Sequence, residues 1–307
     1  MTRPQGIIAP ILTPFEDDGR IARDLWISHA KWVLGQGAHF LSPFGTTGEA
    51  LSVSLRERMQ ALEWLVEAGI APDRLMPGTG VTALPETVEL SAHAVGLGCA
   101  AVMVLPSFFY TGAGDNGQAR YFSELIEKVA KPSMRVILYH IPQNSGVPVS
   151  PALAARLSAR FPDQVVAYKD SGGAFDNTLA VIAAAPRLAV FPSSEGQLTA
   201  GLAAGGAGCI SASVNLNARA IRAVFDGAEA GRDVAGLDAG IKAFRKAVEA
   251  AGLIGGMKAA LAVRTGDRRW LNLRPPHDNT TLAAGAALLE ALGAAASALP
   301  GAARAVA

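Results

Sequence analysis

The sequence predicts an α/β fold in which eight parallel strands alternate with helices, followed by a helical C-terminal extension. Three observations support this prediction. Short apolar runs bounded by Gly, Pro or Asp recur through the first two thirds of the chain. Segments of about 10–15 residues with helical periodicity separate these runs, as in repeated βα units. Hydrophobic residues make up 50% of the 307 residues and charged residues only 17%, which suits strands that are buried on both faces.

The apolar runs define the predicted strands. In chain order they are Gly6–Thr13, Ala38–Pro43, Arg74–Gly78, Ala100–Leu105, Met134–Ile141, Val165–Lys169, Leu188–Phe191 and Ala207–Ala212. Predicted helices between them include Asp24–Gly35, Leu55–Ala68, Pro85–Gly96, Asp115–Ala130 and Ser150–Ala159. Several of these begin with an Asp or Ser cap or with Pro in the first turn. Eight parallel strands within roughly 210 residues fit a closed (β/α)8 TIM barrel better than an open doubly wound sheet.

The strand signals stop near Asn215, and Ala-rich helical sequence continues from there. We therefore expect residues 1–214 to form the barrel and residues 215–307 to form a helical region that packs on it. The last segment, Gly293–Ala307, consists almost entirely of Ala, and we expect it to fray.

Charge and hydropathy exclude two function classes. Lys and Arg number 27 against 26 for Asp and Glu, and there is no polybasic run, so nucleic-acid binding is not expected. The longest uncharged stretch, Gly196–Ala218, is interrupted by glycines, so we predict no transmembrane helix and no membrane partner. The N-terminal residues Met1–Gln5 lack the pattern of a signal peptide, which favours a cytoplasmic protein.

Motifs for common cofactors are also missing. Gly78–Ala83 imitates a dinucleotide-binding loop, but no acidic residue follows at the required distance. The two cysteines have no CxxC spacing, and the five histidines form no HExxH motif. We therefore expect no metal, no nucleotide cofactor and no disulfide framework.

A lysine stands where a barrel enzyme carries its catalytic groups, at the C-terminal end of a strand. The sixth predicted strand ends in Lys169, and a period of two places Val165, Ala167 and Lys169 on one face. Burial disfavours the ammonium form, and a neutral amine can form a Schiff base with a carbonyl compound. In the alternative interpretation, Lys169 is structural and pairs with Asp170 or extends to solvent.

Hydroxyl groups follow two other strands. The fifth strand places Tyr139 on the same face as Ile137, where the phenol either moves a proton beside an imine or only caps the core. His140 should point the other way and pack against the helices. The second strand leads into the turn Gly45–Glu49, whose N–H groups and hydroxyls are suited to hold a carboxylate, unless the turn is only a capped loop.

Four segments together resemble the dihydrodipicolinate synthase/N-acetylneuraminate lyase family. They are Gly45–Glu49, Tyr139–Pro142 with Gly146, Lys169–Gly173 and Gly208–Ser211, and the resemblance spans roughly residues 6 to 276. It implies a (β/α)8 barrel, usually tetrameric, in which a lysine forms an imine with pyruvate or another 2-keto acid. It implies no cofactor beyond this covalent imine.

The resemblance also implies roles for individual residues. Lys169 would be the Schiff-base lysine, Tyr139 the proton donor and acceptor, and Thr46 a member of the proton relay. Thr47 would bind the carboxylate of the keto acid. The implied substrate-binding residues are Thr47, the backbone at Ile210, Gly45 and Asn144.

This chain departs from the family pattern in two places. The synthases usually carry an arginine where this chain has Asn144, and an amide cannot give a charged, bidentate grip on a second carboxylate. This departure argues against a reaction with aspartate semialdehyde. The family's paired tyrosines after the fourth strand are Phe108 and Phe109 here, followed by Tyr110, so the relay across the subunit boundary is lost or shifted.

The segment Lys169–Gly173 is similar to the lysine motif of aldolases that act on 4-hydroxy-2-oxoglutarate and related sugar acids. We therefore expect a catabolic lyase that cleaves or forms a C–C bond with pyruvate, as a homotetramer or dimer. Three alternatives remain open: a dehydratase of a 2-keto-3-deoxy sugar acid that uses the same imine, a 4-hydroxy-tetrahydrodipicolinate synthase, and a non-catalytic keto-acid sensor.

Overall fold

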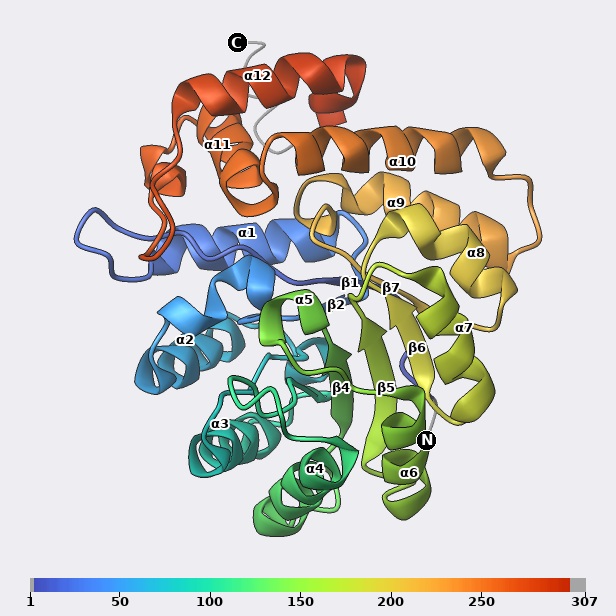
Figure 1. Cartoon of the computed structure of the whole chain (residues 1–307). Coiled ribbons are helices and arrows are strands. Elements are labelled where there is room, and N and C mark those ends of the chain that lie inside the picture. The colour runs from blue at the N-terminus through green and yellow to red at the C-terminus, as the bar shows by residue number, and fades with distance from the viewer. Residues whose placement is uncertain (1–2, 299–307) are drawn as a thin grey trace.

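The computed structural model describes residues 3–298, and its strands lie in the centre with helices around them (Figure 1). The strands are β1 (Gly6–Ala9), β2 (Phe40–Leu41), β3 (Val102–Val104), β4 (Val136–His140), β5 (Val165–Asp170), β6 (Ala189–Pro192) and β7 (Gly208–Ile210). They pair in parallel as two sheets, in the orders β2–β1–β7 and β3–β4–β5–β6.

Backbone hydrogen bonds join the two sheets on both sides. Three of them run from Met76 N–H to Leu41 O (2.8 Å), from Met103 N–H to Pro77 O (2.8 Å) and from Ala207 N–H to Val190 O (2.9 Å). The segment around Met76 and Pro77 therefore takes the place of the third predicted strand, although it is irregular because Pro77 has no N–H to donate. The predicted closed barrel is confirmed, with strands shorter than expected. For example, β1 ends at Ala9 because Pro10 follows.

The helices in chain order are α1 (Arg23–Gly35), α2 (Leu55–Glu67), α3 (Leu84–Gly96), α4 (Asp115–Val129), α5 (Pro142–Ser145), α6 (Pro151–Arg160), α7 (Phe175–Ala184), α8 (Leu198–Ala203), α9 (Val214–Glu229), α10 (Ala235–Ala250), α11 (Leu253–Thr265) and α12 (Leu282–Leu292). The five helices predicted by name agree with α1, α2, α3, α4 and α6 to within one residue at each end. Polar caps set two of these boundaries. Ser54 and Glu57 form a capping box on α2, and Ser150 caps α6. No helix within residues 3–298 is long and apolar enough to cross a bilayer.

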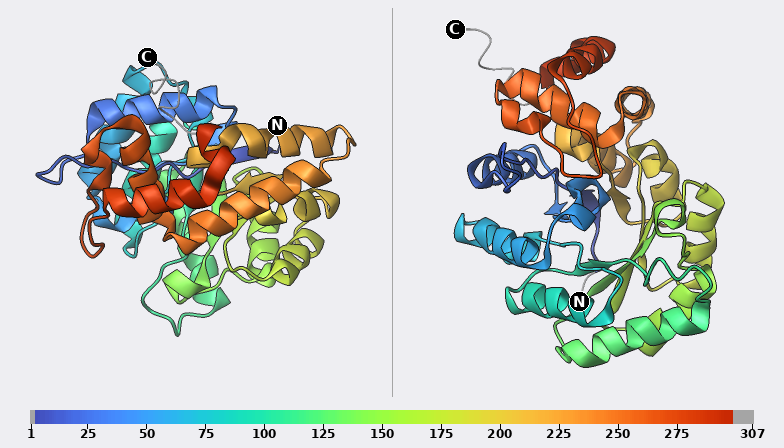
Figure 2. Two further views of the ribbon diagram at one scale, coloured as in Figure 1. Left: turned by 90° about the horizontal axis from the view of Figure 1, so that it is seen from above. Right: turned by 60° about the vertical axis from the view of Figure 1, so that its left-hand side comes forward.

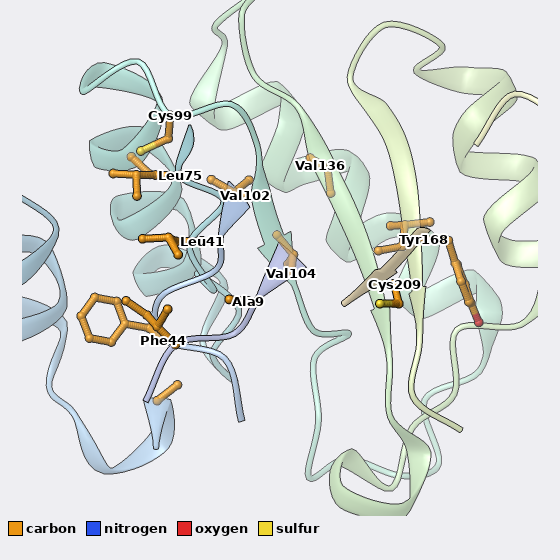
Figure 3. Packing of buried hydrophobic residues seen from close by; sticks show 14 of the residues in the cluster. Ala9, Leu41, Phe44, Leu75, Cys99, Val102, Val104, Val136, Tyr168 and Cys209 are labelled. Atoms are coloured by element: carbon orange, nitrogen blue, oxygen red, sulfur yellow. The ribbon is translucent and has the colours of Figure 1, made fainter. Parts of the chain in front are cut away.

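Side chains alternate between the inside and the outside of the barrel. Ile137, Tyr139 and Ala167 belong to an apolar cluster inside it, together with Ile210. A larger cluster fills the space between the strands and the surrounding helices, and Figure 3 shows part of it, including Tyr168. Tyr139 and Ala167 therefore point inward from neighbouring strands, as the two-residue period predicts.

The prediction for one residue of β5 is wrong. Val136 pairs with Val165, but Ile137 pairs with Ala167, so Val166 is an extra residue in β5. Such a bulge shifts the alternation of side chains by one position. Val165 consequently packs in the outer cluster and not on the inner face with Ala167, while the bulge leaves the rest of the strand in register.

The last three helices form a layer beside the barrel (Figure 2). A separate apolar cluster joins them to the residues that follow β1 and β7, through Leu12, Leu216, Phe244, Met257 and Leu288. Residues 293–298 form a short 3-10 turn. The fraying predicted for the remainder, residues 299–307, lies outside the described residues.

Candidate active site

A pocket of about 390 Å³ opens at the carboxyl ends of the strands. Its lining includes Gly45, Thr46, Tyr139 and Asn144, all of which were predicted from the sequence as site residues. The loop after β3 adds Phe108. The C-terminal region contributes Ile254, Pro276 and His277. The pocket is therefore lined by both the barrel and the C-terminal helical region.

Lys169 and Tyr139 lie directly opposite each other on the paired strands β5 and β4. Both side chains are buried, with 4% and 3% of their surface exposed. The Nζ of Lys169 is 4.1 Å from the centroid of the Tyr139 ring. The amine therefore lies beside the aromatic ring of a residue whose hydroxyl can move protons, and both side chains are shielded from water.

A hydrogen bond connects Tyr139 with the turn after β2. The hydroxyls of Thr46 and Tyr139 are 3.0 Å apart, and either oxygen can be the donor. Thr46 itself is exposed at the pocket, where β2 leads into the short 3-10 turn Thr46–Gly48. The structure therefore brings together three residues of the predicted catalytic set, Thr46, Tyr139 and Lys169.

Two predicted binding residues lie deeper than the pocket. Thr47 is buried in the same turn as Thr46, with 6% of its surface exposed. The side chain of Ile210 packs in the inner apolar cluster that also contains Tyr139. Neither residue is part of the pocket lining, nor is Lys169, which lies against the ring of Tyr139.

The turn that carries Thr46 has an unusual backbone. Phe44 and Glu49, which flank it, adopt left-handed conformations with φ of 57° and 55°. A side chain on Gly48 would place its Cβ 2.8 Å from the carbonyl oxygen of Ile11, so the turn needs glycine there. Left-handed conformations at residues other than glycine persist only where the surrounding contacts enforce them.

A buried ion pair supplies such contacts, and the sequence analysis missed it. Lys258 of α11 is fully buried, and its Nζ lies 2.6 Å from Oε1 of Glu49. The same ammonium donates to the carbonyl of Thr13 (2.9 Å), and Arg274 N–H donates to Oε2 of Glu49 (3.0 Å). Burial lowers the pKa of Lys258 to about 8, against the opposing charge of Glu49. The one available signal was that Lys258 is the sole charged residue between Leu253 and Val263.

Asp170 does not serve Lys169 as a partner in this structure. Its carboxylate accepts hydrogen bonds from Thr178 Oγ1 (2.7 Å), Asn177 Nδ2 (3.0 Å) and Gly172 N–H (2.9 Å). These donors belong to the loop after β5 and to the first turn of α7, on the opposite face of the strand from Lys169. The structure gives no support to the alternative in which Lys169 pairs with Asp170.

His140 faces the helical layer, as the sequence analysis predicts. Its Nδ1 accepts a hydrogen bond from Val149 N–H (3.1 Å), and its ring packs against Tyr168 at 5.9 Å between centroids. Burial lowers the pKa of His140, while the negative charge of Asp170 acts in the opposite direction. Both contacts lie outside the barrel, away from Tyr139.

The aromatic residues after β3 separate into two groups. Phe108 lines the pocket, whereas Phe109 and Tyr110 are exposed over 79% and 68% of their surfaces. The last two rings meet edge to face, with centroids 5.6 Å apart. Tyr110 is not part of the pocket lining, and its role across a subunit boundary stays a prediction.

A closed (β/α)8 barrel with lysine and tyrosine paired at its strand ends has the architecture of a class I aldolase or lyase. The chain belongs to the dihydrodipicolinate synthetase family, whose model matches residues 3–292. The family resemblance inferred from the four sequence segments is thus confirmed, and the protein is an enzyme of the lyase type.

Individual relatives agree with this assignment. An uncharacterized DapA-like lyase of Chloroflexus aurantiacus is 35% identical over 262 residues, which cover 85% of this chain and 87% of that protein. The 4-hydroxy-tetrahydrodipicolinate synthase of Rhizobium meliloti is 31% identical over 216 residues, covering 70% and 72%. The crystal structure of dihydrodipicolinate synthase from Agrobacterium tumefaciens superimposes with a TM-score of 0.85 at 30% identity, covering 93% of this chain and 97% of that chain.

Proposed function

We propose that the protein is a pyruvate-dependent aldolase in which Lys169 forms the imine, and that it cleaves or forms 4-hydroxy-2-oxo acids. The observation that carries this proposal is the position of the Lys169 amine, 4.1 Å from the ring of Tyr139, whose hydroxyl is hydrogen-bonded to Thr46. Thr46 and Tyr139 line a pocket large enough for a small substrate, and the Lys169 amine lies against the Tyr139 ring.

The chemistry follows from these positions. The Lys169 amine adds to the C2 carbonyl of the 2-oxo acid, and loss of water gives a protonated imine. Removal of the proton from the 4-hydroxyl then breaks the C3–C4 bond. The bonding electrons pass into the imine, giving an enamine, and an aldehyde leaves. Protonation of the enamine at C3 and addition of water release pyruvate and restore the amine.

In this proposal, Tyr139 moves these protons. Its hydroxyl takes the proton of the 4-hydroxyl in cleavage and returns it in condensation, and Thr46 passes protons between Tyr139 and the pocket. The carboxylate of the keto acid is assigned to the turn Gly45–Thr47, and the backbone of Ile210 to the wall beneath it. Covalent attachment through Lys169 requires no metal ion or organic cofactor.

The nature of residue 144 separates this function from that of the synthases among the relatives. Asn144 lines the pocket with an uncharged amide, so the pocket offers no guanidinium there for the carboxylate of an aldehydic acid. An aldolase acting on a substrate with a single carboxylate is therefore favoured over condensation of pyruvate with aspartate semialdehyde.

Product analysis tests the proposal. The purified protein is incubated with 4-hydroxy-2-oxo acids, and pyruvate is measured through lactate dehydrogenase while the aldehyde is measured by derivatisation. We expect equal amounts of the two products. A product that has lost water but kept its carbon chain would instead identify a dehydratase, and substrate binding without turnover would identify a sensor.

A further inference from the structure

The pocket has an outer half that is more apolar than the part lined by Thr46 and Tyr139. Apart from Thr46 and Tyr139, much of the lining comes from the turn before α2, the loop after β3, the segment after β4 and the C-terminal region, and we call this part the outer half. The side chains there are mainly hydrocarbon: Leu51, Leu105, Phe108, Ile141, Ile254 and Pro276. In an aldolase whose imine forms at Lys169, this half receives the aldehyde portion of the substrate.

No lysine or arginine belongs to the described lining of this pocket. The nearby guanidinium of Arg274 is occupied elsewhere, because it donates to the carbonyls of Gly19 and Ser52 and to the carboxylate of Glu57. The carboxylate of Glu49, which does line the pocket, is held by Lys258. A negatively charged group on the aldehyde would therefore lose its hydration without gaining a fixed cation.

Hydroxyl groups of a substrate would also find few partners. The Ser145 hydroxyl donates to the carbonyl oxygens of Ile141 (3.1 Å) and Val147 (2.8 Å). The Ser52 hydroxyl donates to the carbonyl of Pro275 (2.7 Å). Both serines in the lining therefore donate their hydrogen to the backbone, and the other polar side chains of this outer half are Asn144 and His277.

We propose that the aldehyde half of the substrate is uncharged and apolar, a short aliphatic or aromatic aldehyde, in contrast to an acidic or polyhydroxylated one. This inference rests on the proposed aldolase function and narrows its substrate to 4-hydroxy-2-oxo acids with a hydrocarbon substituent at C4. Burial of each additional methylene group against this lining should raise kcat/KM about fourfold until the space is filled.

The test measures aldol addition of pyruvate to aldehydes of similar size. Butanal, pentanal and benzaldehyde represent the apolar class, glyceraldehyde the hydroxylated class and succinic semialdehyde the acidic class. We expect kcat/KM to rise from butanal to pentanal and to exceed the values for the other two classes by about tenfold or more. A higher kcat/KM with glyceraldehyde or succinic semialdehyde would overturn the inference. This holds also if the His277→Gln variant loses a preference for succinic semialdehyde, because His277 would then bind the acidic group.

Three variants sharpen the result. Leu51 lines the pocket although 63% of its surface is exposed, so Leu51→Asn should fold normally and lower kcat/KM for pentanal. Leu237→Asn is the matched control, because Leu237 is 51% exposed on α10 and lies outside the pocket. Asn144→Arg should shift the preference toward succinic semialdehyde. Equal effects of the two leucine variants would contradict the inference.

Failure of this inference is distinguishable from failure of the proposed function. Borohydride trapping of pyruvate on Lys169 needs no aldehyde, so it reports the imine alone. An enzyme that traps pyruvate but prefers an acidic or hydroxylated aldehyde retains the proposed function and refutes the apolar pocket. An enzyme that traps no keto acid refutes both.

Discussion

The Nζ of Lys258 and Oε1 of Glu49 lie 2.6 Å apart, and both side chains are buried. They join α11, in the C-terminal helical layer, to the turn that presents Thr46 to the pocket. Glu49 adopts a left-handed conformation, and the ion pair holds its side chain in the position that goes with this backbone. The C-terminal helices thus contribute directly to the shape of the candidate active site.

Lys258→Met should be strongly destabilising, since it leaves the Glu49 carboxylate buried without its countercharge. A broken buried pair costs about 3–5 kcal/mol in the free energy of unfolding. The double variant Lys258→Met with Glu49→Gln should recover part of this loss, because no uncompensated charge remains. Urea denaturation of the three proteins measures both effects. A single variant as stable as the unaltered protein would show that the pair does not support the fold.

Tyr139→Phe should lower kcat by about 10²–10⁴, because the ring keeps its place against Lys169 while the proton-transferring hydroxyl is lost. Trapping of pyruvate on Lys169 should still be detectable in this variant. Tyr121→Phe is a matched control, since Tyr121 is also buried and its hydroxyl bonds to Thr87 (2.8 Å), outside the site. Comparable losses of kcat in both variants would contradict the proton-transfer role of Tyr139.

The hydroxyl group of Thr46 should affect kcat more than the branched shape of its side chain does. Thr46→Val keeps the branched side chain but removes the 3.0 Å hydrogen bond to Tyr139, and we expect kcat to fall about fivefold to tenfold. Thr46→Ser, which retains a hydroxyl, should restore most of the activity. If serine and valine at this position behave alike in steady-state assays, the proton relay through Thr46 is wrong.

Acid should weaken the contact between Glu57 and Arg274, which anchors the segment after Arg274. Hydrogen bonds from Arg274 lower the pKa of Glu57 from 4.5 to about 2, against the effect of burial. Between these values the unfolded chain binds more protons at Glu57 than the folded protein does. The stabilisation is therefore complete above pH 4.5 and is lost as the pH falls toward 2.

Urea denaturation at a series of pH values across this window measures the effect of the Glu57–Arg274 contact. The free energy of unfolding of Glu57→Gln should depend less steeply on pH than that of the unaltered protein. Glu67→Gln is the control, because Glu67 lies on the same helix and forms only an exposed pair with Arg23. An unchanged slope in Glu57→Gln would contradict the assignment.

Local sequence patterns were sufficient to predict five of the helices and the inward direction of Tyr139 and Lys169. Helix caps and the two-residue strand period are properties of neighbouring residues, so they can be recognised in one sequence. The same reasoning placed Val165 wrongly, because a bulge at Val166 depends on the register with β4 and leaves no local signal.

Features that depend on distant segments could not be predicted. Glu49 and Lys258 are 209 positions apart in the chain, and only the closed fold brings them into contact. Ile254, Pro276 and His277 reach the pocket for the same reason. The apolar character of the outer pocket therefore became apparent from the structure and not from the motifs that carry Lys169 and Tyr139.

The most direct test of this account is reduction with borohydride in the presence of pyruvate, followed by proteolysis and mass spectrometry. The account predicts that the peptide containing Lys169 gains the mass of one reduced pyruvate, and that Lys169→Met gains none. Lys258, the other buried lysine, should stay unmodified. No adduct with any 2-keto acid, or an adduct on a different lysine, would contradict the central claim.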